Sequence, residues 1–271
     1  MKHFQIAFVF CAALFLSSCI MEERGSCPSY LTLDLSSIPD DVDSLYLILQ
    51  YNDGTLFRDT LYREELISNH EIAVPRGSAA VAAYGNISGM VYNNGYVTTK
   101  GSPADNIYTH FSRGEYLTDL SKDTISVTKN NMAIHIKVLG SVKASEGLHV
   151  EILGTCTGYS DTGEIVNGEF YHTPENLHIP TEQEDFYSFL TRVTRHPSGS
   201  SLILRLSTLY PDKAGSDTLL EMSIHEKMAQ AGISMSDLHL QDLYLTIDHS
   251  RSAISISVDD FNSENHVEVE F

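Results

Sequence analysis

The sequence contains no tryptophan and few basic residues, and both shortages limit what the protein can do. It carries 17 lysines and arginines against 36 aspartates and glutamates, which gives a formal net charge of −19. Such an acidic surface repels nucleic acid and anionic lipid headgroups, so nucleic acid is excluded as a partner. Carbohydrate sites usually stack sugars on exposed aromatic rings, so the absence of tryptophan weakens the case for a glycan site, although 14 tyrosines remain.

Long apolar runs are absent after the first residues of the chain. Lys2 is followed by the apolar residues 6–16 and then by Ser17, Ser18 and Cys19. The run is shorter than the roughly 20 residues of a membrane-spanning helix. Its order of cationic start, apolar core and small residues before a cysteine is typical of a lipid-attachment signal. An ordinary secretory signal with a cysteine at that place by chance is the alternative.

We therefore expect residues 1–18 to be a signal peptide that is removed. Cys19 then becomes the lipidated first residue, and residues 19–27 form a short tether. One acyl chain holds a protein only marginally, but several chains, palmitate among them, each add about 0.8 kcal/mol per buried methylene. The resulting anchor is stable.

Cysteine is scarce, and only two free thiols remain after processing. The chain has four cysteines, of which Cys11 leaves with the signal and Cys19 carries the lipid. An oxidising compartment allows Cys27 and Cys156 to form a disulfide, but they are far apart in sequence and their distance in the fold cannot be derived from it. An unpaired, buried Cys156 is the alternative.

The remainder of the chain has the pattern of β-structure. Residues 31–35 alternate apolar and polar side chains, as in a strand buried on one face. The runs 44–51 and 55–61 are separated by Asn52-Asp53-Gly54, which predicts a hairpin. Further strands are predicted at 71–77, 79–84, 132–138, 148–153, 186–193, 201–207, 219–224, 243–247, 254–258 and 267–271.

Few helices are predicted in this pattern. Residues 62–69 favour a short helix, and His225–Ala231 consists of good helix formers followed by Gly232. Residues 85–114 are rich in Gly, Asn, Ser and Tyr, which predicts turns and surface loops. We expect an all-β protein with an N-terminal β-sandwich domain at 28–126 and a C-terminal one at 127–271.

None of the motifs in the sequence completes a catalytic or metal site. The segment His225–Ala229 begins like a zinc-protease helix, but Ala229 stands where the second histidine ligand is needed. Cys156 is better explained as a small buried residue at a turn than as a nucleophile. The acidic cluster Asp40–Asp43 lacks the glycine and glutamate of a calcium loop, which favours solvated turn carboxylates. We predict no catalytic residue, no metal and no cofactor.

Several short motifs together resemble the minor fimbrial anchor subunits of Bacteroidia-type fimbriae. After the predicted lipid-attachment cysteine, the motifs that carry the resemblance are Cys27-Pro28, Leu31–Leu35, Ile72–Gly77, Asn131–Ile136, Leu243–Asp248 and Ile256–Asn262. They extend over essentially all of the chain after residue 18.

This resemblance implies two tandem transthyretin-like β-sandwiches and a lipoprotein exposed at the cell outer membrane. It also implies a non-enzymatic role as the anchor at the base of a fimbria, an organelle of cell adhesion, and leaves open a role in limiting its length. Its partners would be shaft subunits, joined by strand addition, in which a segment of one chain completes the sheet of the next. The alternative function is that of a surface glycan-binding lipoprotein of a nutrient-uptake system.

Overall fold

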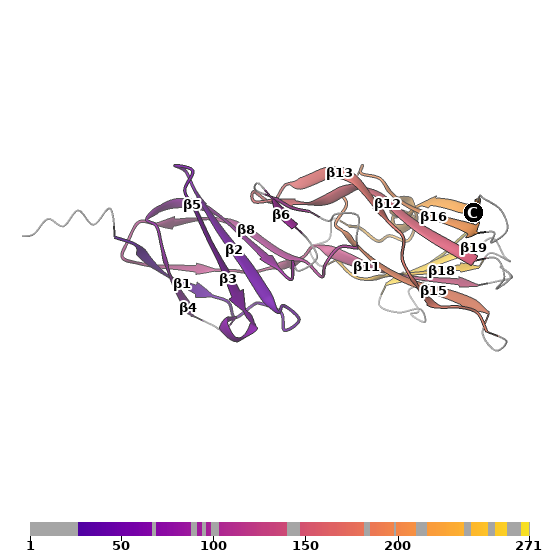
Figure 1. The fold of residues 1–271 in the computed structure, drawn as a ribbon, viewed down its shortest axis with the longest axis horizontal. Helices are drawn as coiled ribbons and strands as arrows, with labels where there is room; N and C mark the ends of the chain where they lie inside the picture. The colour runs from indigo at the N-terminus through magenta and orange to yellow at the C-terminus, as the bar shows by residue number, and fades with distance from the viewer. Residues whose placement is uncertain are drawn as a thin grey trace, which may run out of the picture.

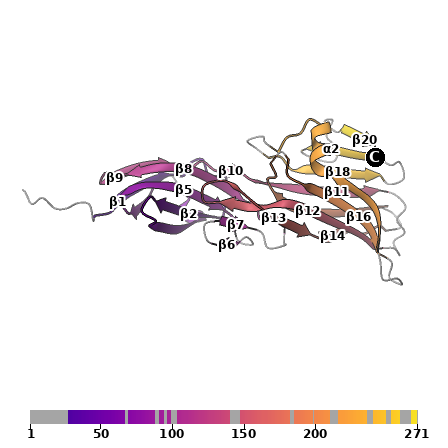
Figure 2. The same ribbon diagram turned by 90° about the horizontal axis from the view of Figure 1, so that it is seen from above.

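The structure is a computed structural model of the 271-residue chain, and it is elongated (Figures 1 and 2). It describes residues 27–66, 69–87, 91–93, 96–98, 103–139, 147–181, 185–197, 199–209, 216–235, 240–248, 253–258 and 267–270. Cys19 lies outside these residues. Strand β1 lies at one end of the molecule, and strands β16 and β19 lie toward the other end (Figure 1). None of the helices in the described part of the chain has the length and apolar character needed to cross a membrane.

The half of the molecule that contains β1 is a sandwich of two sheets. One sheet has the order β4-β1-β9, with bounds His70–Val74, Ser29–Asp34 and Leu120–Thr124. The other has the order β10-β8-β5-β2-β3, with bounds Thr128–Lys129, Tyr108–Tyr116, Gly77–Gly85, Ser44–Tyr51 and Leu56–Tyr62. Leu31 and Leu33 of β1 pack with Leu47 and Leu49 of β2 in a core between the sheets. Burial of alternate side chains explains the period-two pattern of β1.

The other half has a second core between two larger sheets. The first has the order β14-β15-β11-β18-β19-β20, with bounds Asn176–His178, Phe186–Thr194, Asn131–Leu139, Leu243–Asp248, Ala253–Val258 and Val267–Glu270. The second has the order β17-β16-β12-β7-β6, with bounds Ser216–Ser223, Leu202–Leu209, Gly147–Ser160, Tyr96–Thr98 and Val91–Asn93. Strand β13 (Ile165–His172) pairs with β12. The domain limits 28–126 and 127–271 stay a prediction.

The predicted all-β sandwich fold is confirmed, as are its main local features. Asp53 Oδ1 accepts a hydrogen bond from the amide of Thr55, and Gly54 has a φ of +86°, as the β2–β3 turn requires. Met132, Ile134, Ile136 and Val138 of β11 are all buried. At the C-terminus, β20 pairs with β19, so its alternating sequence reflects ordinary sheet pairing.

Both predicted helical segments are present. The first is a 3₁₀ turn, η2 (Arg63–Glu65), in which Glu65 accepts a hydrogen bond from the Tyr62 amide. The second is α2 (Ile224–Gln230), whose first turn is capped by the Ser223 hydroxyl. It ends at Gln230, and Gly232, two residues later, has a φ of +71°.

Two predictions about turns are wrong. The segment 85–114 contains β8, an inner strand of its sheet that pairs with both β5 and β10. Its polar sequence predicts a loop, but the strand pairs with β5 along its whole length, and Tyr108 and Thr109 also pair with β10. Cys156 is buried as expected, yet it lies inside the 14-residue strand β12 rather than at a turn. Two register shifts beside Cys156 accommodate the surrounding small residues.

Candidate functional site

The described residues contain no group of three or more His, Cys, Asp and Glu side chains placed to hold a metal ion. Three other regions are candidates for a functional site: the end of the molecule that carries Cys27, the contact between its two halves, and the exposed sheet edges. The first two are built from residues that are distant in sequence.

The first described residue, Cys27, is fixed to the body of the protein by Arg76. Arg76 Nε donates a hydrogen bond to the Cys27 carbonyl at 2.9 Å, and Nη1 donates to the Leu117 carbonyl at 3.0 Å. Its Nη2 forms an ion pair with Asp119. The Arg76 side chain is only 16% exposed but that of Asp119 is 58% exposed, so the ion pair contributes little and the hydrogen bonds to the two backbone carbonyls carry the contact. The chain therefore enters β1 at a fixed point, eight residues after Cys19.

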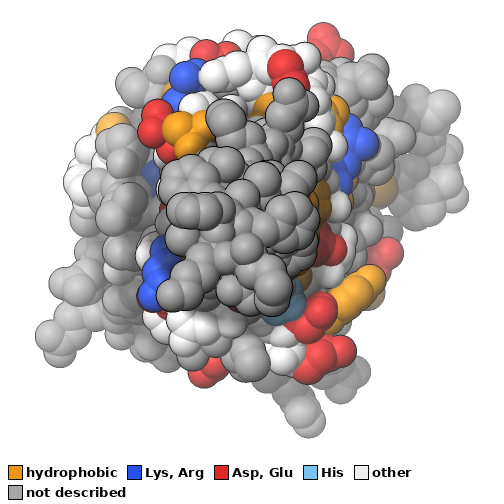
Figure 3. Space-filling view, turned by 90° about the vertical axis from the view of Figure 1, so that its left-hand side faces the viewer, with side chains coloured by type: hydrophobic (Ala, Val, Ile, Leu, Met, Phe, Trp, Pro, Cys, Tyr) orange, Lys and Arg blue, Asp and Glu red, His pale blue; other side chains and the backbone are white. Residues whose placement is uncertain are grey.

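The surface around this entry point is mixed in character. Figure 3 views this end and shows basic, acidic and hydrophobic side chains interspersed. Tyr30 of β1 lies opposite Leu120 of β9 in the parallel register, and both side chains are exposed, Leu120 by 72%. Leu117, whose carbonyl binds Arg76, is also exposed. Apolar side chains are therefore exposed close to the proposed tether.

The two cysteines proposed as a disulfide are not brought together. Both thiols are free, with Cys27 exposed and Cys156 buried. Cys27 lies just before β1 and Cys156 lies in β12, and these strands are in opposite halves of the molecule (Figure 1). The disulfide is therefore not formed in this structure, which agrees with the alternative of an unpaired, buried Cys156. Burial raises the pKa of the Cys156 thiol, which disfavours its reactive thiolate form.

A third hydrophobic core joins the two halves. It contains Ile48 of β2, Ala82 and Tyr84 of β5, and Ile107 from the first half, together with Tyr159 of β12 from the second. Phe111 and Ile165 pack against its edge. We call this cluster, with the polar contacts around it, the joint. Apolar burial of this kind opposes bending between the halves, because bending would expose the buried surface to water.

A buried hydrogen bond crosses the joint. Tyr84 Oη donates to Asp161 Oδ1 at 3.0 Å, and both residues are buried. Asp161 lies in the turn between β12 and β13, which rests on the outer face of β5 and β8. Gly163 of the same turn approaches the Phe111 ring so closely that a Cβ there would come within 2.8 Å of it. The turn therefore needs glycine for its φ of +85° and for this contact.

The segment between the halves is held by Arg195 and Tyr159. Arg195 Nε donates to Asn130 Oδ1 at 2.7 Å, and Nη1 donates to the Met235 carbonyl at 2.5 Å. Tyr159 Oη donates to the Asn130 carbonyl at 3.0 Å, and burial raises the pKa of the Tyr159 hydroxyl. These contacts satisfy the polar backbone where the chain passes from β10 to β11.

Two carboxylates reinforce the same region. Burial raises the pKa of Asp242, but the hydrogen bonds from Lys129 Nζ at 2.8 Å and the Ala133 amide at 3.1 Å outweigh it, so the pKa is lowered overall. Burial has the same opposing effect on Asp41, whose pKa is also lowered because Tyr108 and Asn106 donate hydrogen bonds to it. Burial and Asp41 raise the pKa of Tyr108 to about 12. The Asp41 carboxylate is therefore bound at this turn by the side chains of Tyr108 and Asn106.

Strand β14 forms one edge of the six-stranded sheet of the second half and exposes apolar side chains. Leu177 of β14 is 64% exposed, and Ile179 just after it is 57% exposed. Two residues apart, they point to the same side of an extended chain. Large apolar side chains on an edge strand favour pairing with another strand.

The sequence did not indicate the joint or the β14 edge. The joint depends on pairs such as Tyr84 and Asp161, which are 77 residues apart, and no local pattern reports such contacts. Strands β13 and β14 were not predicted. A polar sequence with Asn176 and His178 in β14 gives little strand signal.

Comparison with known proteins relates this fold to solved structures. No protein-family model matches the chain, and no curated protein matches it. The fimbrial anchor protein Mfa2 of Porphyromonas gingivalis is 13% identical, with a TM-score of 0.63, and the match covers 86% of this chain and 98% of that one. An adhesin candidate of Bacteroides thetaiotaomicron is 15% identical, with a TM-score of 0.61 and coverage of 90% and 99%.

A polysaccharide-binding candidate from the same organism is 11% identical, with a TM-score of 0.65 and coverage of 90% and 99%. These identities are too low to transfer a function, but the coverage includes nearly the whole of each solved chain. The protein therefore resembles a fimbrial anchor and adhesin candidates of Bacteroidales in fold, as the motifs of its sequence indicated.

Proposed function

We propose that this chain is a non-enzymatic outer-membrane lipoprotein that anchors the base of a fimbria to the cell surface. The observation that carries the proposal is the likeness in fold to the fimbrial anchor protein Mfa2 over 86% of the chain. The predicted lipid on Cys19 supplies the membrane attachment, and Arg76 connects the tether to the folded protein. A retained lipid anchor distinguishes a base subunit from shaft subunits, which have to leave the membrane.

The joint supports this role because an anchor has to transmit a pulling force. Force enters at the shaft and leaves through the lipid, so it passes along the chain from the second half to the first. The core around Tyr84 and Tyr159 and the hydrogen bond to Asp161 resist separation of the halves. A flexible linker would instead extend under load.

We propose further that the shaft is attached by strand addition at β14. The unpaired side of this edge strand offers backbone groups to an incoming strand, and Leu177 and Ile179 offer side-chain contacts. The occupant is an extended segment of a shaft subunit. Filling the edge of the base subunit also gives a physical route to ending growth, which connects anchoring with fimbrial length.

The anchoring proposal is tested by deleting the gene and imaging fimbriae on cells and in the medium. We expect fimbriae that are shed or abnormally long. Normal attachment and length after deletion would exclude the anchoring role.

The attachment site is tested separately with Leu177→Asp, which places a charge on the β14 edge. Leu209→Asp is the matched control, because Leu209 is 44% exposed but belongs to the inner strand β16. We expect Leu177→Asp to reduce co-purification of shaft subunits with the anchor, and the control to leave it unchanged. If Leu177→Asp co-purifies shaft subunits as well as the control and the original chain do, β14 is excluded as the attachment site while the anchoring role stays open.

Glycan capture is the second candidate function, and one surface favours it. On the sheet of β15, β11 and β18, the His135 and Tyr244 rings stack at 4.3 Å and the His178 and Phe186 rings stack at 4.2 Å. Lys137 Nζ lies 4.5 Å from the centre of the Phe186 ring. Partly exposed rings can stack on sugars. Binding of soluble polysaccharide, abolished by Tyr244→Ala, together with normal fimbriae after deletion, would favour this function.

A further inference from the structure

The turn between β8 and β9 presents two exposed leucines beside the point where the chain enters β1. Leu117 is 59% exposed and Leu120 is 72% exposed, the largest value among the exposed large hydrophobic residues in the described part of the chain. Tyr30 of β1 lies opposite Leu120 in the parallel register and is also exposed. We call these three side chains, at the end of the molecule that Figure 3 views, the tip.

Hydrogen bonds hold the backbone of the tip in place. The Tyr30 amide donates to the Asp119 carbonyl at 2.9 Å, and Arg76 Nη1 donates to the Leu117 carbonyl at 3.0 Å. Arg76 also forms an ion pair with the Asp119 carboxylate, which compensates the one acidic group of the turn. The apolar side chains are therefore carried on an ordered backbone, and an ordered surface loses little conformational entropy when a partner covers it.

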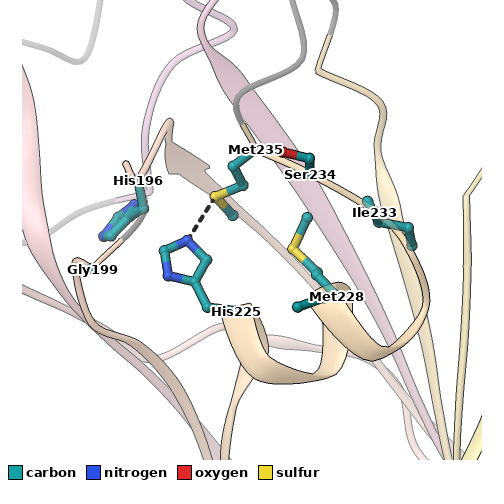
Figure 4. A pocket seen from close by; sticks show the side chains of 8 residues that line it. His196, Gly199, His225, Met228, Ile233, Ser234 and Met235 are labelled. Carbon is teal, nitrogen blue, oxygen red and sulfur yellow. Dashed lines mark hydrogen bonds between the residues drawn. The ribbon is translucent and has the colours of Figure 1, made fainter.

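The turn that follows α2 has the opposite arrangement. Its Met235 is buried, and together with Met228 of α2 it lines a cavity of about 180 Å³ in the second half of the molecule (Figure 4). Among the described residues, none covers Leu120 in this way. The apolar area of the tip therefore contacts water, which is unfavourable unless another apolar surface covers it.

The position of Cys19 indicates what can cover the tip. Cys19 stands eight residues before Cys27, and eight residues extend over at most about 29 Å. Arg76 binds the Cys27 carbonyl at 2.9 Å as well as that of Leu117, so the tether and the tip leave the body of the protein side by side. With Cys19 held in a membrane, the lipid surface lies next to this end of the elongated molecule (Figure 1).

We propose that Leu117, Leu120 and Tyr30 enter the interface of the lipid bilayer that holds Cys19, which gives the protein a second point of contact with the membrane. This inference rests on the lipid anchor of the proposed function. Leucine gains free energy by leaving water, and tyrosine favours the boundary between headgroups and acyl chains. A tether alone lets the body rotate, whereas a second contact fixes its orientation. The half that contains β14 is then directed away from the membrane (Figure 2).

A tryptophan introduced at Leu120 tests the contact, because the chain has no other tryptophan. The lipidated Leu120→Trp chain is bound to vesicles of phosphatidylcholine, since an acidic protein repels anionic headgroups. Bromine on the acyl chains quenches a tryptophan that enters the bilayer, and iodide quenches one that stays in water. We expect brominated lipid to quench Leu120→Trp and iodide to have little effect. Leu209→Trp is the control, because Leu209 is exposed on β16 in the other half, and iodide alone should quench it.

A second substitution measures what the neighbouring leucine contributes. Leu117→Asp, added to the Leu120→Trp chain, removes one leucine from the contact and introduces a charge. It should shift the equilibrium between the inserted and the free tip by about 10-fold or more toward the free tip, which the quenched fraction measures. Circular dichroism establishes that each variant is folded. Equal quenching with and without Leu117→Asp would overturn the proposal.

Flotation of the chain with the vesicles reports the lipid anchor separately. Flotation without quenching of Leu120→Trp by brominated lipid would overturn the membrane contact and leave the anchor intact. Protection from iodide without such quenching would also overturn it and assign the tip to a contact with another protein. A chain that does not float would overturn both the membrane contact and the anchor.

Discussion

The hydrogen bond between Tyr84 and Asp161 is the contact through which the rigidity of the joint is best measured. Tyr84→Phe removes the donor hydroxyl and keeps the ring that packs in the joint, while Asp161→Ala removes the acceptor. Each single variant also alters other contacts of its residue. The double-mutant cycle isolates the energy of the pair itself.

The structure sets the expected size of this coupling. Hydrogen bonds to a charged group contribute about 1.5–3 kcal/mol. The distance of 3.0 Å is longer than the 2.5–2.7 Å typical of a hydroxyl on a carboxylate, which places this bond in the lower half of the range. Both groups are buried, so water does not compete for them. We expect a coupling of about 1.5–2 kcal/mol.

Urea unfolding of the full chain, followed by far-ultraviolet circular dichroism, gives the four free energies. The control is the cycle of Tyr171→Phe with Glu151→Ala, because Tyr171 donates to Glu151 at 2.9 Å in an exposed setting. That cycle should give less than about 1 kcal/mol, since exposed pairs contribute little. A Tyr84–Asp161 coupling below about 0.5 kcal/mol, the limit of simple additivity, would refute the argument that this bond stabilises the joint.

Three further predictions concern stability. Gly163→Ala should lower the melting temperature by more than Gly199→Ala, as measured by thermal unfolding. Both glycines have positive φ, but only a Cβ at Gly163 would collide with the Phe111 ring. Ser223→Ala should cost about 1 kcal/mol in chemical unfolding through the lost cap of α2. The lowered pKa of Asp242 means that it stabilises the fold above its unfolded pKa of about 3.9 and loses this effect as pH falls through its lower folded pKa. The melting temperature of Asp242→Asn should therefore depend less on pH below about pH 5 than that of the original chain. An equally steep fall of the melting temperature with pH in both proteins would contradict this.

Local patterns predicted the elements whose side chains sort cleanly between core and solvent. Leu31 and Leu33 face the core, and Gly54 and Gly232 end their elements with positive φ, so turn chemistry and burial agree. The pattern misled where a strand is polar or rich in small residues. Strand β8 carries His110, Ser112 and Arg113, which pair with β5 but lie beyond the two residues of β8 that also pair with β10.

The candidate sites were less predictable, because they arise from contacts between distant residues. The turn predicted at Cys156 is part of strand β12, in which the His196 ring occupies the space that a side chain at Gly154 would need. Arg76 lay inside a predicted motif, yet its hold on the Cys27 carbonyl required the fold.

Replacement of Cys19 by alanine, with fimbriae then measured on cells and in the medium, tests lipid-dependent anchoring of the fimbria by this chain. We expect the Cys19→Ala protein to be made and exported while fimbriae are released into the medium, since the joint and β14 remain intact but the lipid is lost. Fimbriae that stay attached to cells at the normal level would contradict lipid-dependent anchoring by this chain.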